Sequence, residues 1–85
     1  MKIVFLNKSW EDYIYWQETD QKKLKRINDL IKVISRTPYE GAGNPEPLKY
    51  EFSGFWSRKI DIVNRLVYRV VETEIQILKC KSHYD

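Results

Sequence analysis

Hydrophobic residues recur at helical spacing after Asp20. Positions 24, 27, 30, 31 and 34 are Leu, Ile, Leu, Ile and Ile, the i, i+3, i+4, i+7 pattern of one buried helix face. Asp20 is a suitable N-cap, because its carboxylate can accept hydrogen bonds from the first backbone N–H groups of a helix. The residue before Pro38 is disfavoured in a helix, so we predict that this helix ends near Arg36.

A strand and a shorter helix are predicted before Asp20. Residues 3–6 are Ile, Val, Phe and Leu, a short apolar run that favours a strand. Ser9 is typical of a helix N-cap. Glu11 and Asp12 follow in the first turn, where negative charge is favourable near the positive end of the helix dipole. We predict a helix over residues 10–19.

The second half of the chain is predicted to form strands. Residues 37–47 contain all three Pro and two of the three Gly, which indicates a loop. Four extended runs follow, at residues 48–52, 56–62, 65–71 and 75–81. The breaks between these runs are short, so we expect neighbouring strands to pair in antiparallel fashion.

Apolar and cationic side chains alternate along residues 65–71. One parity has Leu66, Tyr68 and Val70, and the other has Arg65, Val67 and Arg69. One sheet face is therefore apolar, and only the two helices are available to cover it. We predict an α+β fold in the order β-α-α-β-β-β-β. It is a small twisted antiparallel sheet with two N-terminal helices packed on one face, in a single domain over residues 1–85.

Length and composition limit the classes of protein. A chain of 85 residues and 10.3 kDa is too short for a dinucleotide-binding fold or a (β/α)8 barrel. Its 42% hydrophobic and 14% aromatic residues are typical of a folded protein. A single Cys excludes an internal disulfide, which suits the cytoplasm. No stretch approaches the ~20 apolar residues of a membrane span, and we expect no signal peptide.

The positive charge is concentrated in one segment. The chain has a net charge of +3, but residues 21–36 hold six Lys and Arg against Asp29, a local charge of +5. Two interpretations stay open. The cations can form a solvated helix face, or they can contact the phosphates of RNA or of a ribosome.

The residues available for chemistry are few. One His and one Cys, without metal-ligand spacing, predict no metal site, and we expect no cofactor. Cys80 and His83 are three residues apart, which on a strand turns their side chains to opposite faces, so we do not expect them to form a nucleophile–base pair. General acid–base chemistry remains, with Glu46, Arg65 and His83 as candidates, since the unperturbed pKa of His is ~6.5. Taken singly, each is more typical of a solvated or structural residue than of a catalytic one.

Several short motifs change this balance when they are considered together. They are WEDY at 10–13, YWQETD at 15–20, RTP at 36–38, PEPLK at 45–49, SGFWSR at 53–58, RLVY at 65–68 and HY at 83–84. With these motifs the chain resembles, nearly end to end, the YoeB toxins. They are a branch of the RelE superfamily of ribosome-dependent messenger RNA interferases.

The resemblance implies a fold, an activity and a set of site residues. The fold is the one predicted above. The activity is metal-independent cleavage of messenger RNA in the ribosomal A site by 2′-OH attack, which leaves 2′,3′-cyclic phosphate and 5′-OH ends and inhibits translation. The family's catalytic carboxylate, arginine and histidine match Glu46, Arg65 and His83. Its RNA- and phosphate-binding residues match Lys49, Arg58, Lys59 and Tyr84, with Lys59 at a position where some relatives have Arg.

The resemblance also implies partners. These are a cognate antitoxin of the YefM type, the ribosome with its message, and operator DNA bound only by the toxin–antitoxin complex. A homodimer is compatible with the sequence, and no membrane partner is expected. The alternative is a non-catalytic RNA- or partner-binding module, which the composition alone also permits.

Overall fold

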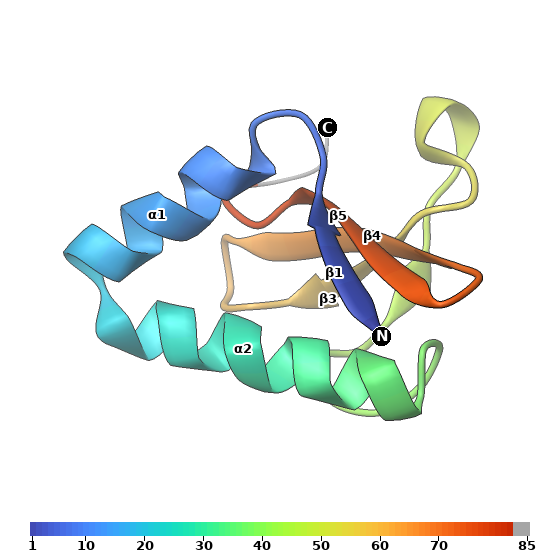
Figure 1. Ribbon diagram of the computed structural model, residues 1–85, viewed down its shortest axis with the longest axis horizontal. Coiled ribbons are helices and arrows are strands. Elements are labelled where there is room, and N and C mark those ends of the chain that lie inside the picture. The colour runs from blue at the N-terminus through green and yellow to red at the C-terminus, as the bar shows by residue number, and fades with distance from the viewer. Residues whose placement is uncertain (83–85) are drawn as a thin grey trace.

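The structure is a computed structural model that describes residues 1–82 (Figure 1). In chain order its elements are β1 (Lys2–Phe5), α1 (Ser9–Thr19), α2 (Gln21–Arg36), β2 (Glu46–Pro47), the 3-10 helix η1 (Tyr50–Phe52), β3 (Trp56–Lys59), β4 (Arg65–Val71) and β5 (Glu74–Lys79). The predicted order of strands and helices is confirmed.

Helix α2 forms where the hydrophobic pattern predicts it. The Asp20 carboxylate accepts hydrogen bonds from the backbone N–H groups of Lys22 and Lys23 at 3.1 and 3.3 Å, so the predicted N-cap is confirmed. The residues of the apolar stripe that are fully buried are Ile27, Leu30 and Ile34. Burial of this stripe against the sheet stabilises the helix more than intrinsic propensity does.

Helix α1 is attached to the sheet at both ends. The prediction that Ser9 is the N-cap is wrong, because Ser9 is the buried first residue of the helix. Its Oγ donates a hydrogen bond to the Ile77 carbonyl at 2.8 Å. Near the other end, the Trp16 indole N–H donates to the Cys80 carbonyl at 2.7 Å. These bonds satisfy polar groups that burial would otherwise leave without partners.

The sheet has five strands in the order β1-β5-β4-β3-β2. The pairs β2–β3, β3–β4 and β4–β5 are antiparallel, as predicted, but β1 runs parallel to β5, with Ile3 opposite Ile75 and Phe5 opposite Ile77. The sheet is therefore mixed rather than wholly antiparallel. Local sequence patterns do not encode the direction of a strand whose partner lies some seventy residues away.

The predicted strand at residues 48–52 is wrong. The strand that pairs with β3 is Glu46–Pro47, and residues 50–52 form η1 instead. The φ of Tyr50, 58°, lies in the left-handed region and turns the chain out of the sheet.

Two other strands end earlier than predicted. β3 stops at Lys59 because the Asp61 carboxylate accepts hydrogen bonds from the backbone N–H groups of Val63 and Asn64, which closes a turn. β5 ends at Lys79.

The core lies between the two helices and one face of the sheet. The two helices lie on the same side of the sheet, and the loop that contains η1 projects away from them (Figure 1). The buried cluster is made of Trp16, Ile27, Leu30, Ile34, Ile60, Leu66, Tyr68, Ile75, Ile77 and Cys80. Neither helix covers the opposite face of the sheet (Figure 1). Over residues 1–82, no helix is long and apolar enough to cross a membrane.

Candidate active site

Sheet register places Glu46 and Arg65 on the face opposite the helices. Residues directly opposite each other in neighbouring strands have side chains on the same face. Glu46 pairs with Ser57 and Ser57 with Val67, while Arg65 lies two residues before Val67 and so shares its face. Tyr68 has the other parity and belongs to the buried cluster under the helices.

Glu46 and Arg65 lie side by side. The Arg65 Nη1 is 3.9 Å from the Glu46 Oε1, and the side chains are 18% and 52% exposed, respectively. Arg65 also donates a hydrogen bond to the Ser57 Oγ at 3.4 Å, and the Asn44 amide donates to the Glu46 Oε1 at 3.2 Å. The carboxylate is thus held on two sides and remains open to solvent. The structure brings together two of the three predicted catalytic residues.

The end of the described chain is fixed beside Arg65. The Arg65 backbone N–H donates to the Ser82 carbonyl at 3.1 Å, and the Ser82 N–H donates to the Asn64 side-chain oxygen at 2.6 Å. His83 and Tyr84, which follow Ser82 in the sequence, lie outside the described residues. Their proposed roles therefore stay predictions.

Both predicted phosphate-binding lysines lie near this pair. Lys59 is exposed and stands directly opposite Arg65 in the β3–β4 ladder. Lys49 is also exposed and lines a hollow of about 380 Å³ together with Glu46. Lys59 thus neighbours Arg65 across the β3–β4 ladder, and Lys49 shares the hollow with Glu46.

Arg58 has a different environment from the one predicted. Its side chain is fully buried, and its guanidinium donates to the Tyr68 hydroxyl and to the carbonyls of Thr37, Glu40 and Ala42 at 2.7–3.0 Å. A phosphate contact would require these bonds to open and would uncover a buried charge. The structure therefore gives Arg58 a structural role in place of the predicted phosphate contact.

The Arg58 network holds the loop that leads to Glu46. The Tyr68 hydroxyl donates in turn to the Pro38 carbonyl at 2.6 Å. Burial raises the pKa of Tyr68, and the neighbouring Arg58 charge opposes that rise. Close by, the Lys59 backbone N–H donates to the Gly43 carbonyl at 2.7 Å. The loop is thereby fixed to β3 three residues before Glu46.

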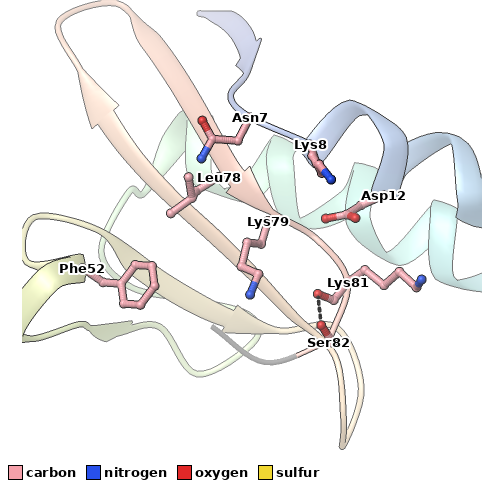
Figure 2. A pocket seen from close by; sticks show the side chains of 8 residues that line it. All are labelled: Asn7, Lys8, Asp12, Phe52, Leu78, Lys79, Lys81 and Ser82. Carbon is pink, nitrogen blue, oxygen red and sulfur yellow. Dashed lines mark hydrogen bonds between the residues drawn. The ribbon is translucent and has the colours of Figure 1, made fainter. Parts of the chain in front are cut away.

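A second hollow, of about 480 Å³, lies beside Ser82. Its lining residues are Asn7, Lys8, Asp12, Phe52, Leu78, Lys79, Lys81 and Ser82. Lys79 points into it, whereas the Lys81 side chain extends toward α1, where its ammonium is 4.0 Å from the centre of the Tyr15 ring (Figure 2). The hollow therefore brings cations, the Asp12 carboxylate and the Phe52 ring together next to the end of the described chain.

Cys80 is unsuited to nucleophilic chemistry. It is fully buried, and its thiol lies 3.7 Å from the Ser9 carbonyl. Burial, with a smaller contribution from the Asp12 carboxylate, raises the pKa of Cys80 to about 12. A thiol with that pKa stays protonated at neutral pH and is a poor nucleophile. In residues 1–82, no three His, Cys, Asp or Glu side chains are grouped closely enough to hold a metal ion.

Sequence reasoning missed the residues that position the pair. Asn44 holds Glu46, and Ser57 contacts Arg65. Ser57 lies two residues from Lys59 and so shares its face, a signal that alternation in β3 could have supplied. For Asn44 the signal is weaker, because its contact depends on how the loop folds back.

Comparison with known proteins identifies the family. The model of the YoeB-like toxins of bacterial type II toxin–antitoxin systems matches residues 5–84. The chain belongs to this family. Its relatives include the toxin YoeB of Escherichia coli strain K12, which is 54% identical over 99% of this chain and all of its own length. Another is the toxin YoeB of Synechocystis, 51% identical over 100% of this chain and 99% of its own.

Solved structures confirm the YoeB fold. A YoeB/ParE toxin from Agrobacterium tumefaciens superimposes with a TM-score of 0.95 at 45% identity, over 99% of this chain and all of that one. The toxin in a YoeB–YefM complex from Staphylococcus aureus gives 0.92 at 44% identity, over 99% and 98%. YoeB from the same organism has also been solved as a dimer, with the same TM-score. The α+β fold predicted from the sequence is therefore confirmed.

Proposed function

We propose that this member of the YoeB family is a ribosome-dependent endoribonuclease that cleaves messenger RNA in the ribosomal A site. The observation that carries the proposal is the contact between Glu46 and Arg65. It places a solvent-accessible carboxylate 3.9 Å from a guanidinium on the sheet face opposite the helices, beside the end of the described chain. A carboxylate and a guanidinium at this distance can serve one phosphodiester.

The proposed reaction uses the nucleophile that RNA carries. Glu46 takes the proton of a 2′-OH as its oxygen attacks the neighbouring phosphorus. Arg65 stabilises the charge that develops on the phosphoryl oxygens. As the P–O5′ bond breaks, His83 gives a proton to the leaving 5′-oxygen, which yields a 2′,3′-cyclic phosphate and a 5′-OH. General acid–base groups contribute ~10²–10⁴-fold each, and a charge-stabilising donor ~10²–10³-fold.

The ribosome supplies what a small protein lacks. An 85-residue chain with a net charge of +3 has little surface with which to hold and bend a free message. A ribosome would present the message in position and so remove that entropic cost. Lys49 and Lys59 would contact backbone phosphates, and the exposed lysines of α2 would meet ribosomal RNA. Tyr84 would pack against a base or against His83.

An antitoxin would restrain the activity. YoeB of Staphylococcus aureus has been solved in complex with YefM and as a dimer, which supports a YefM-like partner and a homodimer for this chain. A basic surface with exposed aromatic side chains suits an acidic, partly apolar peptide. The toxin–antitoxin pair, rather than the toxin alone, would bind operator DNA.

Mapping cleavage on ribosomes tests the proposal. Wild type, Glu46→Gln, Arg65→Gln and His83→Gln are each mixed with ribosomes stalled at a defined codon, and the message ends are mapped. Glu72→Gln is the matched control, because it removes the same charge from an exposed turn between β4 and β5. We expect cuts in the A-site codon with wild type and Glu72→Gln, and rates lower by ~10²-fold or more with the other variants.

Two results would contradict the proposal. If folded wild type cuts no message, only a binding module remains. If Glu46→Gln cuts as fast as wild type, the carboxylate is not part of the chemistry. The acid and base assignments are tested separately by pH–rate profiles, because survival of the acidic limb in Glu46→Gln would assign the base to another group.

A further inference from the structure

The loop between β2 and β3 holds an aromatic ring almost wholly in solvent. Tyr50 is 91% exposed, whereas tyrosine usually covers at least part of its apolar ring. Its φ of 58° is in the left-handed region, which costs backbone energy for a residue with a bulky side chain. The core gains nothing from this arrangement, so packing does not explain it.

This loop is held in one conformation. The Leu48 backbone N–H donates to the Phe55 carbonyl at 2.9 Å across the base of the loop, and the Ser53 N–H donates to the Tyr50 carbonyl at 3.0 Å within it. Leu48 is 8% exposed and anchors the loop to the protein body. The ring is therefore presented from a preorganised position, which lowers the entropy cost of binding a ligand.

The surroundings of Tyr50 select the kind of ligand. Tyr50 lines the 380 Å³ hollow that also contains Glu46, Lys49 and Glu51, with apolar surface from Pro47, Leu48 and Phe52. Two carboxylates against one ammonium leave the hollow itself without an excess of positive charge, so it is not built as a phosphate pocket. An uncharged, flat base suits the hollow better, because its faces are apolar and its exocyclic amino groups can donate to carboxylates.

We propose that Tyr50 stacks on a base of the message next to the scissile phosphate. The inference rests on the proposed function, since Glu46 would take its proton from a 2′-OH at the rim of the same hollow. Aromatic side chains bind single-stranded nucleic acid by stacking on its bases. Tyr50 is thus a substrate-binding residue that sets affinity and local base preference and leaves the proton transfers unchanged.

A series of variants tests this role under single-turnover conditions on stalled ribosomes. The measurement gives the half-saturating protein concentration and the maximal cleavage rate separately. We expect Tyr50→Ala to raise the half-saturating concentration roughly 5- to 150-fold, the range that one stacked base supplies. Tyr50→Phe and Tyr50→His keep a ring and should stay within about 3-fold of wild type. Ile62→Ala is the matched control, because Ile62 is 93% exposed in the turn between β3 and β4.

An abasic substrate identifies the base. Single abasic nucleotides are placed in turn at each position of the A-site codon and at the nucleotide after it. At the stacked position, the abasic site should weaken wild type as much as Tyr50→Ala does and should weaken Tyr50→Ala no further. Effects that simply add at every position would overturn the inference.

Other outcomes are equally clear. If Tyr50→Ala matches wild type in a protein that cleaves, this inference fails and the proposed function stands. If Ala, Phe and His lose activity equally, the hydroxyl or the loop matters and stacking is wrong. A wild type that cuts no message overturns both proposals together.

Discussion

Replacing Tyr68 with Phe removes one oxygen atom from the buried network around Arg58. The Tyr68 hydroxyl accepts from the Arg58 Nε at 3.0 Å and donates to the Pro38 carbonyl at 2.6 Å. Both side chains are fully buried, so the variant leaves a charged donor without its partner inside the protein. The backbone and the ring remain as they were, which makes the change a test of this network alone.

The expected cost follows from these two bonds. A hydrogen bond to a charged group contributes about 1.5–3 kcal/mol and a neutral one about 1 kcal/mol. Pro38 is only half-buried, so water can satisfy its carbonyl in the variant. We therefore expect the free energy of unfolding to fall by about 2–4 kcal/mol, which lowers the Tm of a domain of this size by roughly 10–25 °C.

Urea and thermal unfolding measure this loss directly. Tyr15→Phe is the control, because Tyr15 is 42% exposed, and the change should shift the free energy of unfolding by less than about 0.5 kcal/mol. The double variant Arg58→Met with Tyr68→Phe should lose less than the sum of the single losses, since both remove the same bond. A loss of under about 0.5 kcal/mol in Tyr68→Phe, or full additivity in the double variant, would show that the bond between Tyr68 and Arg58 does not stabilise the fold.

Three further predictions concern other parts of the fold. Gly43→Ala should lower the free energy of unfolding by about 1–3 kcal/mol, because the φ of Gly43 is +87° and an added Cβ would lie 3.0 Å from Leu30. An unchanged midpoint of urea unfolding would contradict this. The Cys80 thiol, with a pKa raised to about 12, should resist alkylation near pH 8 until the protein unfolds, so rapid labelling of folded protein would show that the site opens. Burial opposes ionisation of Asp61, yet hydrogen bonds from Asn64, Val63 and Lys23 hold its pKa well below 3.8. The ionised carboxylate therefore stabilises the folded protein fully above about pH 4, and this contribution is lost as the pH falls further. The gap in stability between wild type and Asp61→Asn should therefore narrow below about pH 4, and a gap that stays constant down to about pH 2 would contradict the assignment.

Periodicity along the chain was sufficient for the helices and for the face of β4. The apolar stripe of α2, the Asp20 cap and the alternation in β4 each depend on residues close together in sequence, and such local signals can be read without a structure. The motifs indicated the family and identified Glu46 and Arg65 as candidate catalytic residues. Their contact depends on sheet register instead, because the two residues are nineteen positions apart and lie on different strands.

The environments of Arg58 and Tyr50 could be seen only in the folded protein. As a cation in a motif, Arg58 looked like a phosphate ligand, but three loop carbonyls and a tyrosine hydroxyl converge on it, so its charge is satisfied inside the protein. Tyr50 was predicted to lie in a strand, yet a positive φ and the closed loop present its ring to solvent. Local spacing in the sequence was enough to predict the two helices and four of the five strands, but not β2 or η1. Whether a given side chain is buried or exposed depends on contacts between residues that are far apart in the sequence, and such contacts form only when the chain packs and its loops close.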